Sequence, residues 1–275
     1  MESDARDDVA PDRDEWMRRT GPLYPAMVAL RQLTRLPVLR GVTPTLEDLT
    51  RAAPWYAAIG GLVGGLVALA AMLVQATDMV PAIAGATAVA LSVILGGGLH
   101  EGGFARAVEL IAGGADREQP YAREALGLYG VVAVISLLAA RALLLLGIAP
   151  GSWIGALILG HIALGWVPVF LSRVGDKVGE PLPGERTLLC GQPSWASVGI
   201  GAGFAVVVGV LFGGGVGILA LVAAAAVAFG LGLFFQRRYN GLSASSLAAS
   251  GVVCELVVLL IFAAAHPATA SPWAS

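Results

Sequence analysis

The segment GGGLHEGGF at residues 96–104 brings glycines together with a histidine and a carboxylate. Glycine lets a backbone turn sharply and approach a ligand closely, and a nest of exposed amides can hold phosphate. His100 and Glu101 would then lie at the membrane surface beside that nest, as candidate catalytic groups. The alternative is a flexible exit turn with an interfacial histidine. The segment is neither a Walker loop nor a dinucleotide-binding fingerprint, because no Lys-Ser or Lys-Thr pair follows it.

Three ionisable residues lie inside long apolar stretches: Glu255, Arg141 and His161. Such groups are costly in a membrane and usually face a partner, a cavity or a metal ion. Glu255 is therefore a candidate site residue, and its alternative is a structural pair with Arg141 or a bond to another polar neighbour. His161 and Arg141 could contact each other or line a polar cavity, and a packing role is the alternative for His161.

The predicted loops contain further acids that could supply metal ligands, and ordinary solvated carboxylates are the alternative for each. They are Asp116, Glu118, Glu124, Asp176, Glu180 and Glu185.

The elements that must position these residues are membrane helices. Of the 275 residues 57% are apolar and only 13% are charged, which excludes an ordinary soluble domain. Stretches of about 17 to 25 apolar residues can cross a bilayer, and we predict a polytopic all-α bundle with seven crossings. A long tract is divided at Gly213–Gly215, because a single helix there would be too long for the bilayer. The crossings are 56–75, 79–95, 128–149, 152–171, 195–212, 216–235 and 248–265.

The basic residues predict the orientation of this bundle. Arginine and lysine accumulate in cytoplasmic loops, and with the N-terminus inside, sixteen of the seventeen fall on the cytoplasmic side, Arg141 being the exception. The predicted location is the inner (plasma) membrane, with the active face in the cytoplasm. Within the first crossing, Gly60 with Gly64 and Gly61 with Gly65 have the four-residue spacing of small residues at helix contacts.

Three regions make up the predicted domain organisation. Residues 1–20 are read as a disordered cytoplasmic tail, 21–265 as one transmembrane helical domain and 266–275 as a short outer tail. Apolar residues at helical spacing from Leu23 to Leu36 predict an interfacial helix that ends before Pro37. The two cysteines do not suggest a disulfide framework.

Three segments in this order resemble the cobalamin synthase family, also called adenosylcobinamide-GDP ribazoletransferase. They are LTRLPV at 33–38, the glycine-rich segment with its following helix at 96–110, and CELVVLL at 254–260. The resemblance extends from about residue 25 to 262 and includes LGLYG at 126–130.

The resemblance implies a membrane-bound transferase of late cobalamin biosynthesis. Such an enzyme joins adenosylcobinamide-GDP to alpha-ribazole or its 5'-phosphate, releases GMP and uses Mg²⁺. The implied partners are these corrinoid and ribazole substrates and the lipid bilayer, with no nucleic acid; a homo-oligomer is left open. The implied site has His100, Glu101 and Glu255 as catalytic residues, Glu109 as a metal ligand, and Arg35, Gly97, Gly98, Arg106, Arg123 and Ser245 as substrate-binding residues.

The chain departs from the family pattern at five positions where the family has acids: Gly102, Arg106, Glu109, Arg123 and Ser245. Only Glu109 keeps a negative charge. One interpretation is that the arginines turn outward to bind substrate phosphates while other glutamates hold the metal. The other is that the metal, and with it the reaction, is lost. Three hypotheses for the function follow. The first is a ribazoletransferase, the second a non-catalytic corrinoid-binding paralogue and the third a small-solute transporter.

Overall fold

The computed structural model describes residues 13–39, 41–77, 80–112, 127–178, 188 and 191–268, and this part of the chain forms a bundle of helices with no strand. The predicted all-α membrane fold is confirmed. The elements are α1 (Arg13–Thr20), η1 (Gly21–Leu23), α2 (Tyr24–Leu33), α3 (Leu46–Ala52), η2 (Ala53–Trp55), α4 (Tyr56–Gln75), α5 (Pro81–Gly96), α6 (Leu99–Ala112), α7 (Leu128–Gly147), η3 (Pro150–Ser152), α8 (Trp153–Val174), α9 (Trp195–Tyr239) and α10 (Ala244–Ala265).

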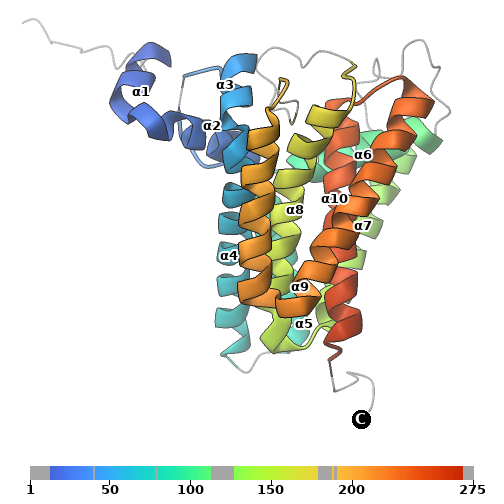
Figure 1. The fold of residues 1–275 in the computed structure, drawn as a ribbon. Helices are drawn as coiled ribbons and strands as arrows, with labels where there is room; N and C mark the ends of the chain where they lie inside the picture. Colours follow the sequence, from blue (N-terminus) through green and yellow to red (C-terminus); the bar gives the residue numbers. More distant parts are fainter. Residues whose placement is uncertain are drawn as a thin grey trace, which may run out of the picture.

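Five of the described helices, α4 being taken together with α3 and η2, are long and apolar enough to cross a membrane, and six if the bent pair α5 and α6 counts as one crossing. Helix α9 counts once here, yet its backbone breaks at Gly214, with φ 54° and ψ −137°, inside the predicted glycine division. Beyond the break, a side-chain carbon built on Gly217 would lie against the carbonyl oxygen of Gly209. Eight residues of straight helix would instead separate the two glycines by about 12 Å. The two arms of α9 therefore form a hairpin, drawn in orange in Figure 1. The total of seven crossings stays a prediction.

Helix α8 lies at the centre of the bundle, packed against α4, α9 and α10. Its close approach to α4 depends on two glycines of α4. A side-chain carbon at Gly64 would lie 2.6 Å from the carbonyl oxygen of Leu157 and 2.8 Å from the Cα of Ile158. A side-chain carbon at Gly60 would overlap the backbone of His161 in the same way. The predicted helix contact is confirmed at Gly60 and Gly64. It fixes the height of His161 in the bundle. Of the second pair, Gly61 lies against Ile162 and Phe204, whereas the prediction is wrong for Gly65, which has no atom within 4 Å of the position of a side-chain carbon.

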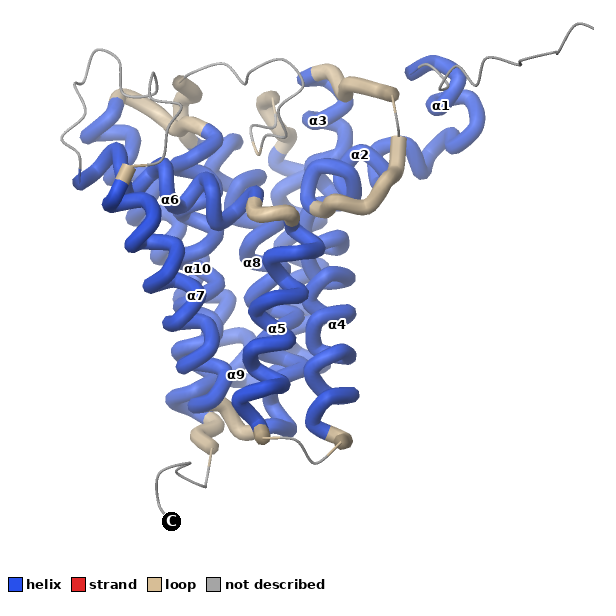
Figure 2. Tube along the Cα trace, turned by 180° about the vertical axis from the view of Figure 1, so that it is seen from behind, coloured by secondary structure: helices blue, strands red, loops and turns tan. Residues whose placement is uncertain are grey.

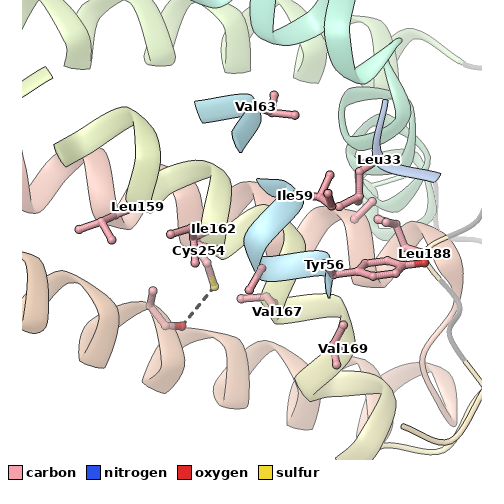
Figure 3. Packing of buried hydrophobic residues seen from close by; sticks show 14 of the residues in the cluster. Leu33, Tyr56, Ile59, Val63, Leu159, Ile162, Val167, Val169, Leu188 and Cys254 are labelled. Atoms are coloured by element: carbon pink, nitrogen blue, oxygen red, sulfur yellow. Dashed lines mark hydrogen bonds between the residues drawn. The ribbon is translucent and has the colours of Figure 1, made fainter. Parts of the chain in front are cut away.

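The apolar core around α8 combines side chains from helices far apart in the sequence (Figure 3). Tyr56 and Val63 of α4 and Ile162 of α8 pack in it, and Cys254 of α10 donates a hydrogen bond to the carbonyl of Ala224 at 3.2 Å. These contacts join α4, α8, α9 and α10 into one body.

Helices α1 and α2 lie beside one end of the bundle, next to α3 (Figures 1 and 2). Residues 13–20, which we predicted to belong to a disordered tail, form α1, while 1–12 are outside the described residues. Arg13 donates from Nε and Nη2 to the two carboxylate oxygens of Asp48, each at 2.9 Å, and Asp48 is buried. These two hydrogen bonds join α1 to α3, and the hydrogen bond and the charge of Asp48 raise the pKa of Arg13. Helix α2 ends at Leu33, ahead of Pro37, as predicted.

Candidate active site

The glycine-rich segment is the point where α5 ends and α6 begins. Gly97 and Gly98 have φ of 60° and 69°, conformations that glycine adopts without strain, and α6 leaves α5 at 89°. The amide of Arg35 donates to the carbonyl of Leu95 at 2.8 Å, and the side chain of Arg35 lies against Gly97. The segment turns at Gly97 and Gly98, and from Leu99 to Ala112 it is helix. A phosphate held by the backbone amides of this segment stays a prediction.

Helix α6 turns back across the bundle and packs against α7 and α10 (Figure 2). This path buries His100 and Glu101 within the protein, with 7% and 6% of each residue exposed. Glu101 forms an ion pair with Nη1 of Arg141 on α7.

Arg141 also pairs with the second predicted catalytic carboxylate. Its Nε and Nη2 donate to Oε2 of Glu255 on α10, at 3.0 and 2.5 Å. Arg141 is 2% exposed and Glu255 3%. We call Glu101, Arg141 and Glu255 the ionic cluster. The alternative interpretation of Glu255 as a partner of Arg141 is thus confirmed, while a direct contact of Arg141 with His161 is not found.

His161 has both ring nitrogens hydrogen-bonded. Nδ1 lies 2.8 Å from the carbonyl oxygen of Leu157, which can only accept, so Nδ1 carries the proton. Nε2 is then the acceptor for the hydroxyl of Ser92, at 2.9 Å. Sequence reasoning missed Ser92, because a serine in an apolar helix commonly bonds its own backbone and gives no separate signal.

A small cavity lies beside the ionic cluster, between α4, α5, α6 and α8. Its polar lining consists of Ser92, His100, Glu101 and His161. It offers about 20 Å³ to the centre of a water-sized molecule, enough for one water and far too little for a corrinoid. The cavity can therefore hold a small group but not a large molecule.

Glu109 lies one turn from the end of α6 and serves a different element. Its Oε2 accepts a hydrogen bond of 2.7 Å from the amide of Gly130, in the first turn of α7. The residue before α7, Gly127, has no side chain with which to cap the helix, and Glu109 satisfies one of the free amides instead. Its role as a metal ligand stays a prediction.

The predicted substrate-binding residues that the structure describes lie at the same end of the bundle as the bend. Arg106 is exposed on α6, and Ser245 is half-buried in the first turn of α10. The Cα of Ser245 lies 3.7 Å from the position that a side-chain carbon at Gly103 would take. Two segments at which the family pattern has acids therefore meet here, and Gly102, Arg106 and Ser245 supply no carboxylate to this contact. Arg123 is outside the described residues.

The described residues do not fit the magnesium ion that the resemblance implies. Nowhere among them do three His, Cys, Asp or Glu side chains gather in a way that could hold a metal. Glu101 and Glu255 both face a guanidinium, which competes with a cation for the same oxygens. The loop acids Asp116, Glu118, Glu124, Glu180 and Glu185 lie outside the described residues.

Comparisons with known proteins identify the family of the chain. The family model described as cobalamin-5-phosphate synthase matches residues 25–263. The chain is 30% identical to an adenosylcobinamide-GDP ribazoletransferase of Polaromonas sp., over 85% of this chain and 94% of the relative. A protein of the same name from Rhizobium johnstonii is 30% identical, over 86% and 95%, and one from Ralstonia nicotianae is 28% identical, over 86% and 93%. No solved structure matches the chain. The protein therefore belongs to the cobalamin-5-phosphate synthase family.

Proposed function

We propose that this protein is an adenosylcobinamide-GDP ribazoletransferase, which joins adenosylcobinamide-GDP to alpha-ribazole or its 5'-phosphate and releases GMP. The observation that carries the proposal is that three helices, α6, α7 and α10, meet beside one polar cavity. The bend at Gly97 and Gly98 turns α6 inward, so that His100 and Glu101 face a polar cavity beside Glu255. The relatives that match nearly the whole chain carry this enzyme's name.

In the proposed reaction a ribazole hydroxyl attacks the phosphorus that carries the corrinoid. One P–O bond forms, the phosphoanhydride bond to GMP breaks, and the hydroxyl proton passes to neutral His100. Glu101 follows His100 in the first turn of α6, and in the proposed reaction its carboxylate stabilises the imidazolium that results. The described residues form no magnesium site, and no step is assigned to the metal.

The substrates dock at the mouth of the bundle where α6 lies. Arg35 and Arg106 are exposed at this end, and cationic side chains there suit the phosphates of both substrates. Because arginine and lysine accumulate on the cytoplasmic side, the proposal places this end in the cytoplasm, with the helices in the inner membrane.

Purified protein in lipid nanodiscs tests the proposal. Supplied with both substrates and Mg²⁺, it should release GMP and form the joined corrinoid product, and omitting either substrate should abolish both. The absence of GMP under conditions in which a ribazoletransferase relative is active would contradict the proposal.

A second candidate is a non-catalytic protein that binds corrinoid. It is favoured by the absence of a carboxylate at Gly102, Arg106 and Ser245, and by the pairing of both buried glutamates with Arg141. Corrinoid binding by calorimetry separates the two functions. Binding without turnover, unchanged in His100→Ala, would favour this candidate over the enzyme.

A further inference from the structure

We propose that Arg141 is a built-in cation, which holds the position between Glu101 and Glu255 where two carboxylates would otherwise bind a divalent metal ion. The carboxylates come from α6 and α10, and the guanidinium of α7 lies between them. The three side chains are almost completely buried. The inference concerns ion binding and holds whether or not the transferase activity is found.

The distribution of charge in the described residues supports this exchange of a metal for an arginine. Their buried carboxylates are Asp48, Glu101 and Glu255. Asp48 is paired with Arg13 of α1 and does not line the cavity, so only the other two lie in or beside it. Both are already paired with Arg141, which leaves neither carboxylate unpaired.

The guanidinium has properties that a bound ion lacks. Arginine stays protonated in proteins and has five N–H donors in a fixed plane, and three of its nitrogens are used here: Nη1 for Glu101, and Nε and Nη2 for Glu255. The cluster thus keeps its geometry without any metal. If the guanidinium is removed, two carboxylates and the neighbouring cavity remain, and carboxylate oxygens with water are the ligands that Mg²⁺ and Mn²⁺ prefer.

The test is Mn²⁺ binding, followed by electron paramagnetic resonance, in nanodiscs that contain the full-length protein. Three proteins are compared: the wild type, Arg141→Met, and a matched control in which Arg141→Met is combined with Glu101→Gln and Glu255→Gln. We expect Arg141→Met to bind one Mn²⁺ more than either of the other two. Any Mn²⁺ held by loop carboxylates is common to all three and cancels.

Thermal unfolding gives an independent readout. Mg²⁺ should raise the unfolding temperature of Arg141→Met by roughly 5 °C at saturating concentration and leave the wild type and the control unchanged. If Arg141→Met folds only when Mg²⁺ or Mn²⁺ is present during extraction, the proposal is supported.

The proposal is overturned if Arg141→Met binds no more Mn²⁺ than the control. It is equally overturned if Arg141→Met stays unfolded with either ion, or if the wild type loses a bound Mn²⁺ when only Glu101→Gln is introduced. None of these readouts measures transfer, so a failure here is distinct from a failure to release GMP.

Discussion

Arg141 on α7 donates two hydrogen bonds, from Nε and Nη2, to a single carboxylate oxygen of Glu255 on α10, and both residues are buried. The two residues are 114 positions apart in the chain. This contact and the ion pair with Glu101 tie α6, α7 and α10 together at the level of the cavity.

Removing the guanidinium alone should be strongly destabilising. Arg141→Met leaves two buried carboxylates without a counter-charge, and breaking a buried ion pair in this way costs about 3–5 kcal/mol. Chemical unfolding in detergent micelles, with Mg²⁺ absent, measures this loss. Neutralising both acids as well, with Glu101→Gln and Glu255→Gln, should recover most of it. A loss of the same size in the triple variant would show that the charges are not its cause.

The contact between α4 and α8 predicts opposite results at two neighbouring glycines. The new methyl group of Gly64→Ala would overlap the backbone of Leu157 and Ile158, and overpacking of this kind costs about 1–3 kcal/mol. The position of Gly65 has no atom within 4 Å, so Gly65→Ala should be neutral or slightly stabilising. Thermal unfolding of the two variants compares them directly, and equal destabilisation would contradict the packing described here.

Two variants of Glu109 separate its capping role from metal binding. Glutamine keeps an oxygen that can accept from the amide of Gly130, so Glu109→Gln should unfold close to the wild-type temperature. Glu109→Ala loses the cap and should cost about 1 kcal/mol. A metal ligand would respond differently, because the amide of glutamine carries no charge: a large and equal loss of Mn²⁺ binding in both variants would assign Glu109 to a metal site.

The ion pair between Arg13 and Asp48 should control the accessibility of α1. In Arg13→Gln both hydrogen bonds to the buried carboxylate are lost, and we expect trypsin to cut after Arg18 several-fold faster than in the wild type. Arg51→Gln is the matched control, because the pair of Arg51 with Glu47 is exposed on both sides and such pairs contribute little. Equal cleavage rates in the two variants would show that Arg13 does not hold the helix.

Much of the fold follows from local sequence signals. The apolar stretches predict α4, α7, α8 and α10 closely, because each must supply its own backbone hydrogen bonds in lipid. The glycine triplet predicts the break at Gly214, because a backbone with φ of 54° suits glycine. The spacing of Gly60 and Gly64 likewise predicts a close helix contact, since small residues at that interval line one face of a helix.

The site was predictable only in part. Glu255 and Arg141 are recognisable as a pair because both are ionisable groups in apolar helices. The place of Glu101 in the same cluster depends on the 89° bend, which turns α6 inward, and no local pattern gives the direction of such a turn. The cap that Glu109 provides for α7 also depends on a tertiary contact.

The rate of GMP release by His100→Ala tests the central claim most directly, with His266→Ala as control. His266 ends α10, at the end of the bundle opposite α6. If His100 accepts the ribazole proton, the variant should lose about 10²- to 10⁴-fold in rate, while His266→Ala should keep the wild-type rate. Equal rates in the two variants, or no GMP from the wild type, would contradict the proposed site.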